Sequence, residues 1–360
     1  MNKKIAILAG DGIGPEVIAE ARKVLDAIAE RFDHTFIYEE ALVGAAAIDV
    51  TGDPFPASTE KVCREADAIL FGAIGDPKYD NDPSAKVRPE QGLLRMRSSL
   101  GLYANIRPVT SYPSLEDRSP LKNKVIHGTD FVVFRELTGG IYFGEPRGRS
   151  ENGDVAFDSC VYHRSEITRI AHKAFQAARQ RNKRVTLVDK ANVLATSRLW
   201  REEVKNVAAD YDDITLDYLF VDNAAMKIIL QPSSFDVMLT ENMFGDIITD
   251  EASVIAGSLG LLPSASMGDT YALFEPIHGS YPQAAGKNTA NPMGAILSAA
   301  MLLEYSFQAV EEGKAIRDAV ADALEEGAVT EDLNSENPLS TREVGDAVVK
   351  KILAPKEIAE

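Results

Sequence analysis

The chain has 360 residues, of which 45% are hydrophobic and 26% are charged, a composition typical of folded globular proteins rather than disordered ones. Its 55 acidic and 38 basic side chains leave a formal net charge of -17, which disfavours nucleic acid and acidic membrane surfaces as partners. A chain of this length usually forms two domains rather than one.

Export and membrane insertion are not expected from the apolar runs. The N-terminal run, residues 5–9, stops at Gly10 and is too short for an export signal. A later run at 295–303 is well below the length of a membrane span. Cys63 and Cys160 form neither a disulfide framework nor a CxxC motif, which is typical of a reducing compartment. We therefore expect a cytoplasmic protein without a membrane partner.

Strand and helix patterns alternate along the N-terminal part of the chain. Strands are predicted at 4–9, 35–39 and 68–72, with a helix from Pro15 between the first two. This alternation favours a parallel sheet covered by helices. The glycine-rich turn at 10–16 reads GxGxGP, so the GxGxxG spacing of a standard Rossmann dinucleotide site fails.

The pattern is less regular further along. Residues 75–89 are polar and predicted to be a loop of functional length, and residues 148–164 interrupt the alternation and suggest an arm that pairs with another subunit. Residues 257–266 are predicted to be a turn-rich connector and 274–286 a loop. The remaining predicted elements are strands at 131–135, 155–162, 184–188, 215–221 and 235–240, and helices from 165 and at 245–257, 290–307, 311–325 and 341–353.

Two carboxylates lie close together after the strand at 235–240. Asp246 and Asp250 are four residues apart near the start of the predicted helix, so they share one face at the carboxyl end of a strand. Their mutual repulsion suggests a bound cation, and hard oxygen ligands favour Mg²⁺ or Mn²⁺. From the spacing alone, acidic residues that only offset the helix dipole are the more frequent explanation, because aspartate is common at helix starts. Asp222, after the strand at 215–221, adds a third carboxylate at a strand end.

Arginines stand out in this acidic chain. Arg97, Arg107 and Arg135 lie at predicted strand and helix ends, and convergent guanidinium groups suggest a di- or tricarboxylate substrate. Each of them alone is more often a surface residue or an ion-pair partner. Arg95 lies beside Arg97, and Arg97 is preferred for its ten-residue distance from Arg107. Lys190, at another strand end, would titrate if it were buried and is otherwise an ordinary exposed lysine.

Six motifs in order resemble the isocitrate/isopropylmalate dehydrogenase family of β-decarboxylating dehydrogenases, and they cover nearly the whole chain. They lie at residues 10–16, 102–108, 135–145, 189–192, 242–250 and 275–280. The resemblance implies a two-domain α/β fold that is not Rossmann, with parallel or mixed sheets flanked by helices. The first domain would comprise residues 1–103 and 257–360. The second, residues 104–256, would make the dimer contact and carry the arm.

The resemblance also implies the roles of individual residues in a homodimer with shared active sites. Lys190 of the other subunit and Tyr142 would be the acid-base pair. The substrate would be contacted by Arg97, Arg107, Arg135, Asp222, Glu90, Leu93 and Leu94. The metal would be bound by Asp246 and Asp250, and by Asp222 of the other subunit. The cofactor NAD would be contacted by Ile13, Gly75, Asp76, Glu90, Glu275, His278, Gly279, Ser280, Gln283, Ala285, Gly286 and Asn291.

The expected activity is NAD-dependent oxidative decarboxylation of 3-isopropylmalate, a step in leucine biosynthesis. Leu93 and Leu94 suit an isopropyl group, whereas burying a third carboxylate against them would be costly. Gln283 stands where NAD-using relatives usually carry an aspartate, but no basic residue replaces it to attract NADP. Tartrate, D-malate and homoisocitrate remain alternative substrates. A metal-dependent hydrolase or a metabolite-binding protein is the alternative from another class.

Overall fold

The structure is a computed structural model that describes residues 1–80 and 87–354. The chain folds into two compact units, Met1–Leu100 with Gly257–Glu360, and Gly101–Ala256. We call them unit 1 and unit 2. The predicted boundaries were 103/104 and 256/257, so the first differs by a few residues and the second coincides with the structural one.

Unit 1 combines the two ends of the chain around one sheet. Its N-terminal elements are β1 (Asn2–Gly10), α1 (Gly14–Phe32), β2 (Thr35–Glu40), α2 (Ala45–Thr51), α3 (Ala57–Glu65), β3 (Ala68–Ala73), α4 (Pro77–Asp80) and α5 (Pro89–Ser99). Its C-terminal elements are η5 (Leu259–Leu261), β11 (Pro263–Met267), β12 (Ala272–Pro276), η6 (Pro282–Ala284), α11 (Met293–Met301), η7 (Leu302–Ser306), α12 (Val310–Glu325) and α13 (Thr341–Leu353).

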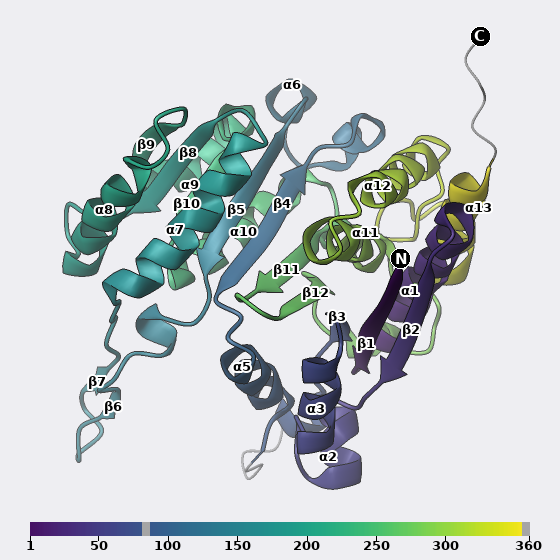
Figure 1. Cartoon of the computed structure of the whole chain (residues 1–360), viewed down its shortest axis with the longest axis horizontal. Coiled ribbons are helices and arrows are strands. Elements are labelled where there is room, and N and C mark those ends of the chain that lie inside the picture. The colour runs from purple at the N-terminus through teal and green to yellow at the C-terminus, as the bar shows by residue number, and fades with distance from the viewer. Residues whose placement is uncertain (81–86, 355–360) are drawn as a thin grey trace. The chain divides into compact units, whose positions relative to one another are not determined.

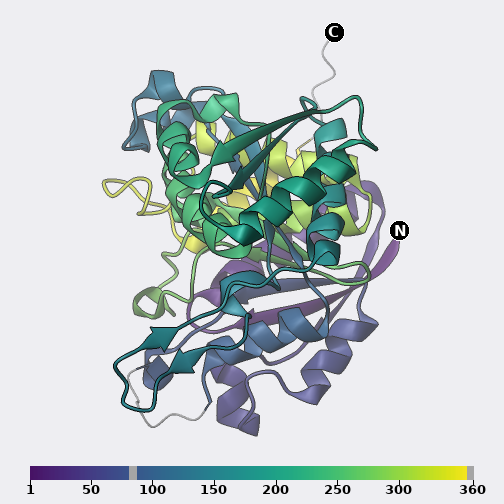
Figure 2. The ribbon, with the colours of Figure 1, turned by 90° about the vertical axis from the view of Figure 1, so that its left-hand side faces the viewer.

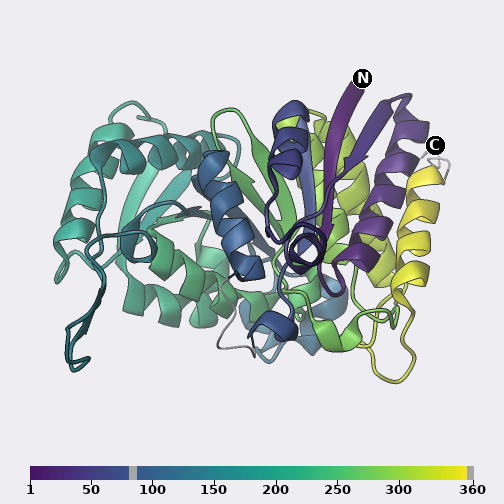
Figure 3. The ribbon, with the colours of Figure 1, turned by 90° about the horizontal axis from the view of Figure 1, so that it is seen from below.

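The strands of unit 1 lie in the order β2-β1-β3-β12-β11. All neighbouring pairs are parallel except β11 and β12, which are antiparallel. The helices α1, α11, α12 and α13 pack against one another, and Figure 3 shows the first and last helices side by side. The two ends of the chain therefore build one body.

Unit 2 is built from one continuous segment and also has a five-stranded sheet covered by helices. Its elements are β4 (Ala104–Thr110), η1 (Pro113–Arg118), α6 (Asn123–Ile126), β5 (Asp130–Glu136), η2 (Gly140–Tyr142), β6 (Gly148–Arg149), β7 (Ala156–Phe157), α7 (Arg164–Arg179), β8 (Arg184–Asp189), α8 (Ala195–Ala208), β9 (Thr215–Phe220), α9 (Val221–Leu230), η3 (Pro232–Ser234), β10 (Val237–Thr240), α10 (Asn242–Ala252) and η4 (Ser253–Ile255).

The strands of unit 2 lie in the order β4-β5-β10-β8-β9, with β4 antiparallel to β5 and the other pairs parallel. Helices α7 and α8 pack together on one face, and α9 and α10 on the other (Figure 1). The short strands β6 and β7 form a hairpin that extends away from the rest of the unit (Figure 2). The predicted α/β class with mixed sheets flanked by helices is confirmed.

Helix α10 begins at Asn242, three residues before the predicted start at Gly245. Glu241 caps it, because its side chain accepts a hydrogen bond from the Phe244 amide. Ile248 and Ala252 anchor the helix in the core of unit 2, whereas Ile247 is 59% exposed. Asp246 and Asp250 consequently lie beyond the first turn, and the exposed amides of the helix start bind Glu241 instead.

Four other predictions of local structure were wrong. Residues 263–267 and 272–276 are strands rather than connector and loop, because pairing inside a buried sheet overrides the weak strand propensity of proline, serine and alanine. The strand predicted at 155–162 shrinks to Ala156–Phe157, since its partner β6 offers only two residues. The predicted loop at 75–89 contains α4 and the first residue of α5. Its residues 81–86 lie outside the described part of the chain.

Among the described residues, no helix is both long enough and apolar enough to cross a membrane.

Candidate active site

A cluster at α10 in unit 2 contains five predicted site residues, which are hydrogen-bonded in two groups, namely Arg135, Tyr142 and Asp246, and Arg107 and Asp250. Asp246 is the centre of the first group. Arg135 donates from Nη1 to Oδ1 of Asp246, and the Tyr142 hydroxyl donates to Oδ2 at 3.0 Å. A single carboxylate therefore holds a predicted substrate-binding residue and the predicted proton donor together.

The second half of the cluster joins Arg107 to the next turn of α10. Its Nη1 lies 2.7 Å from Thr249 Oγ1 and 3.4 Å from Asp250 Oδ1. Arg107 lies on β4 and Arg135 on β5, and these antiparallel strands bring the two arginines to the same helix. The side chains of Arg107 and Arg135 are 12% and 6% exposed, against 39% and 71% for Asp246 and Asp250. The carboxylates are thus accessible above nearly buried guanidinium groups.

Tyr142 lies at the end of η2, in a glycine-rich turn. Partial burial raises the pKa of its hydroxyl, and the hydrogen bond to the Asp246 carboxylate raises this pKa further. A phenol in this setting keeps its proton at neutral pH. Tyr142 is therefore suited to donate a proton rather than to accept one.

Lys190 and Asp222 form a separate pair in unit 2. Lys190 follows β8, Asp222 lies in the first turn of α9, and Lys190 Nζ is 2.6 Å from Asp222 Oδ1. This hydrogen bond lowers the pKa of the Asp222 carboxyl group. In the described residues of one chain, no three acidic, histidine or cysteine side chains are grouped closely enough to hold a metal ion. One chain therefore brings together two of the three predicted metal ligands.

In unit 1, the predicted substrate residues lie on α5. Glu90, Leu93, Leu94 and Arg97 follow the spacing of one helix face. Leu94 is 47% exposed and Leu93 is partly buried, so this face presents apolar surface. Arg97 donates from Nη2 to the buried Glu275 at 3.1 Å.

Arg95 points to a different set of partners. It bonds the Asp53 carboxylate and the Phe55 carbonyl, both in the segment between α2 and α3. Arg95 therefore acts as an ion-pair partner, whereas Arg97 lies on the same face of α5 as Leu93 and Leu94.

Several predicted cofactor residues of unit 1 lie close together around Gly75. The Ile13 amide donates to the Ser280 carbonyl at 2.8 Å. Gly75, with φ of 120°, is so close to Glu90 and Ser280 that an added Cβ would lie 3.1 and 3.3 Å from their side-chain oxygens. The glycine-rich turn, the loop after β3, helix α5 and the loop after β12 thus meet at one place.

Asp11 holds this arrangement in place, and sequence reasoning did not single it out. Its carboxylate accepts backbone hydrogen bonds from Ala45, Ala46 and Gly75 at 2.9, 2.9 and 3.0 Å. Desolvation nevertheless raises its pKa, and the three amides counteract this effect. Its position between two glycines was the only signal in the sequence, and glycine-flanked aspartates are common in turns.

His278 presents a buried acceptor. Its Nδ1 lies 2.9 Å from the Gly279 carbonyl, so Nδ1 carries the proton, and Nε2 is buried without a hydrogen-bond partner among the described residues. Burial also lowers the pKa of the ring, which keeps it neutral at physiological pH. Nε2 is therefore available to accept a hydrogen bond from a ligand.

The other predicted cofactor residues are either exposed to solvent or hydrogen-bonded to neighbouring residues of unit 1. Gln283 is exposed in η6, as are Ala285 and Gly286 after it. Asn291 donates to Asp332 at 3.1 Å and accepts from the Met293 amide at 3.0 Å. Asp76 accepts from the Lys78 amide at 2.8 Å. The structure places these residues in unit 1 with the rest of the predicted cofactor set.

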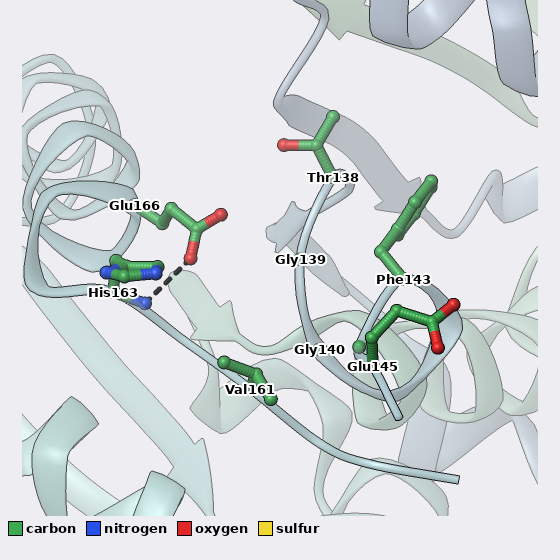
Figure 4. Close-up of a pocket in the computed structure, with 9 residues that line it drawn as sticks. Thr138, Gly139, Gly140, Phe143, Glu145, Val161, His163 and Glu166 are labelled. Carbon is green, nitrogen blue, oxygen red and sulfur yellow. Dashed lines mark hydrogen bonds between the residues drawn. The ribbon is translucent and has the colours of Figure 1, made fainter. Parts of the chain in front are cut away.

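A cavity of about 230 Å³ lies next to the Tyr142 turn in unit 2. Figure 4 shows Thr138, Phe143 and Glu145 on one side of it and His163 and Glu166 on the other. The Glu166 carboxylate accepts a hydrogen bond from the His163 amide at 2.7 Å, and this contact caps the start of α7. None of the five clustered residues lines this cavity. We therefore assign the site from the side-chain network and not from the cavity.

Comparison with known proteins gives the same family that the sequence motifs resemble, and the match extends over nearly the whole chain. The family model described as isocitrate/isopropylmalate dehydrogenase matches residues 4–348. The 3-isopropylmalate dehydrogenase of Bacteroides fragilis (strain YCH46) is 55% identical over 354 residues, which cover 98% of this chain and 99% of the relative. The 3-isopropylmalate dehydrogenase of Halalkalibacterium halodurans is 53% identical over 364 residues, with 100% of both chains covered.

Solved structures match as well. An isocitrate dehydrogenase from Methylococcus capsulatus has a TM-score of 0.86 and 33% identity, covering 98% of this chain and 100% of the other. A β-decarboxylating dehydrogenase from Thermococcus kodakarensis has a TM-score of 0.82 and 36% identity, covering 97% and 96%. With the family match and the full-length relatives, these findings establish that the chain belongs to the isocitrate/isopropylmalate dehydrogenase family.

Proposed function

We propose that the chain catalyses the NAD-dependent oxidative decarboxylation of 3-isopropylmalate to 4-methyl-2-oxopentanoate and CO₂, a step in leucine biosynthesis. The observation that carries this proposal is the hydrogen-bonded group of Arg135, Tyr142 and Asp246, with Arg107 bonded to Asp250 on the same helix. It occurs in a chain whose relatives at 51–55% identity and near-complete coverage are named 3-isopropylmalate dehydrogenase.

Each unit offers groups that suit part of the substrate. Arg107 and Arg135 offer guanidinium donors suited to the carboxylates of a malate. In unit 1, Leu93 and Leu94 lie on the same face of α5 as Arg97, which combines an apolar surface with a further cation. A third carboxylate would be desolvated against the two leucines, which disfavours isocitrate as the substrate.

The residues of unit 1 fit NAD. Neutral His278 keeps Nε2 as a buried acceptor, which suits an amino group such as that of adenine. Ile13, Gly75, Glu90 and Ser280 would contact the rest of the cofactor. The exposed amide of Gln283 can bond the ribose hydroxyls, and the chain has no basic residue at this position to attract the additional phosphate of NADP.

The residues of α10 fit a divalent cation in part. Asp246 and Asp250 are four residues apart, offer hard oxygen donors and are more exposed than the arginines beside them. Two carboxylates from one helix leave most of a metal coordination sphere open. We propose that Asp222 of the other subunit, the substrate and water supply the remaining oxygens, with Mg²⁺ or Mn²⁺ as the ion.

When bound, NAD would supply the acceptor for the hydride of C2, and the divalent cation would supply positive charge to stabilise the reacting acid. Lys190, in its neutral form, would take the proton of the C2 hydroxyl group as the hydride leaves, so that C2 becomes a ketone. The bond from C3 to its carboxyl group then breaks, CO₂ leaves and the electron pair remains on C3. Tyr142 would donate its hydroxyl proton to C3, and Arg107 and Arg135 would keep the acid oriented throughout.

We also propose that two copies of the chain share their active sites. Met226 and Leu230 on α9 and Ile247 on α10 are 57%, 66% and 59% exposed, and these helices pack side by side. Such an apolar surface on adjacent helices suits a second copy. The hairpin of β6 and β7 adds Val155 and Phe157, which are 57% and 44% exposed.

Subunit complementation tests the shared sites. Lys190→Met and Asp246→Asn chains should each form inactive homodimers, whereas co-expression should give mixed dimers in which one site has both residues. A randomly mixed sample should then reach about one quarter of wild-type turnover, because half of the dimers are mixed and each has one complete site. A mixture that stays inactive although mixed dimers are isolated would place each site within a single chain.

The substrate assignment is tested by a panel. Wild-type protein with NAD and Mg²⁺ should reduce NAD on 3-isopropylmalate with a higher kcat/KM than on D-malate, tartrate, homoisocitrate or isocitrate. NADP should be a poorer cofactor. A higher kcat/KM on one of the other acids would move the assignment to that acid within the same family.

A further inference from the structure

Asn242, the first residue of α10, contacts both the arginine and the turn on which the proposed chemistry depends. Its side chain is buried, and Oδ1 accepts two hydrogen bonds from Arg135, at 3.0 Å from Nε and 2.8 Å from Nη2. On the other side, Nδ2 donates to the carbonyls of Leu137 and Gly139 at 3.2 and 3.0 Å. Only this orientation of the amide satisfies both sets of partners.

Through these contacts Asn242 reaches both the proposed substrate-binding residue, Arg135, and the turn that carries the proposed proton donor, Tyr142. Leu137 and Gly139 lie at the start of the turn that presents Tyr142, so the Asn242 amide fixes the base of that turn. Arg135 is held along one face of α10, with Asn242 at Nε and Nη2 and Asp246, one turn later, at Nη1. Gly245 allows this close packing, since a Cβ there would lie 2.7 Å from the Arg135 side chain.

Asn242 is itself held rigidly. Its backbone amide donates to the Tyr162 hydroxyl at 3.0 Å, and that hydroxyl donates to the Glu241 carboxylate at 3.0 Å. The Tyr162 ring packs edge-on against Trp200 with centroids 5.4 Å apart. The same ring supports the turn, because a Cβ on Gly140 would lie 2.3 Å from the Tyr162 hydroxyl oxygen.

We infer that Asn242 is a positioning residue whose amide sets the Arg135 guanidinium and the Tyr142 turn in register with each other. The inference rests on the proposed roles of Arg135 and Tyr142. Asn242 does not act on the substrate itself. Both the orientation of the substrate by Arg135 and the delivery of a proton by Tyr142 then depend on one buried side chain. A planar amide can hold these two groups in a fixed relation, because its oxygen and nitrogen cannot move independently.

The substitution Asn242→Asp separates the two contacts. The oxygen that faces Arg135 is kept, whereas the donor to Leu137 and Gly139 is replaced by an oxygen that repels both carbonyls. We expect the KM and the dissociation constant of the substrate to stay close to wild type, because Arg135 keeps its partner. We expect kcat to fall by at least about tenfold, because a small displacement of the reacting group is costly.

The solvent deuterium isotope effect on kcat should rise at the same time, since a displaced Tyr142 makes proton delivery more strongly rate-limiting. A variant that is merely less folded would lose active enzyme without changing this isotope effect. Tyr162→Phe is the second variant, because it removes the hydroxyl that holds the Asn242 amide and keeps the ring. It should show the same signature in a milder form. Tyr211→Phe, which removes a buried hydroxyl bonded to His172, is the matched control and should keep wild-type kinetics.

The measurements use whichever acid of the panel the wild-type enzyme turns over. A wrong substrate assignment therefore appears in the wild-type enzyme, and a wrong assignment of Asn242 appears only in the variants. Unchanged kcat and isotope effect in folded Asn242→Asp would overturn the inference. If that variant does not fold, wild-type kinetics in Tyr162→Phe would overturn it instead, and a wild-type enzyme inactive on every acid would overturn both proposals.

Discussion

The Tyr142 hydroxyl group donates a 3.0 Å hydrogen bond to Asp246, the carboxylate that also binds Arg135. Asp246 thus links the proposed proton donor to the proposed substrate-binding group. Because an adjacent negative charge stabilises the protonated phenol, the contact keeps Tyr142 in the form required for proton delivery.

Replacing Tyr142 with phenylalanine removes only this hydroxyl group. We expect kcat for 3-isopropylmalate to fall by about 10² to 10⁴, the usual range for a positioned acid or base. The dissociation constant of the substrate should change little, because Arg107 and Arg135 are untouched. Steady-state kinetics and calorimetric titration measure the two quantities. Tyr218→Phe, at a partly exposed tyrosine on β9, is the control, and a similar loss of turnover there would speak against a specific role for Tyr142.

The sequence predicted most strands and several helices of this fold because their apolar residues recur with clear periods. β1, β8, α12 and α13 begin and end within about two residues of the predicted bounds, and α7 begins one residue before its predicted start. β11 and β12 were missed because Ser264 and Ala265 form a buried strand only through their neighbours in the sheet. No local pattern contains that information.

The sequence predicted the motif residues of the candidate site but not the residues that position them. The family motifs named Arg135, Tyr142 and Asp246, and the structure joins these three residues by hydrogen bonds. Asn242 and Asp11 were not singled out, although each contacts three backbone or side-chain groups. Polar residues that act through other residues carry no spacing rule, so only the folded contacts reveal them.

Lys190→Met is expected to lower kcat at least about a hundredfold while substrate binding persists, because methionine keeps the length of the side chain and removes the base. The pKa of Asp222 should rise in this variant, since the Lys190 hydrogen bond is what lowers it. Turnover at saturating substrate and titration of Asp222 by NMR check both expectations. Lys205→Met, at an exposed lysine of α8, serves as the control, and unchanged turnover in Lys190→Met would remove this residue from the mechanism.

The apolar face of α5 should set the choice of substrate. Leu94→Asn is expected to lower kcat/KM for 3-isopropylmalate by about 10- to 200-fold, the range for losing a small apolar contact in a binding pocket. Because Leu94 is 47% exposed, the melting temperature should hardly change. Leu42→Asn replaces a similarly exposed leucine, at 45%, and should leave kcat/KM unaltered. Equal kcat/KM values for the two variants would show that Leu94 does not contact the substrate.

Burial of His278 predicts a loss of stability in acid. Its pKa in the folded protein lies below the ordinary value of 6.5, so the neutral ring stabilises the fold fully above that pH. As the pH falls below 6.5, the unfolded chain binds the proton first, and stability decreases until the folded-state pKa is passed. Replacing His278 with glutamine removes this contribution. The melting temperature of wild-type protein should therefore fall more steeply than that of His278→Gln between about pH 7 and 5. NAD affinity should decline in the wild-type enzyme only, and at lower pH, below the folded-state pKa of His278, because protonation there occupies the Nε2 acceptor. Parallel melting curves for the two proteins would mean that His278 is exposed to solvent in the folded state.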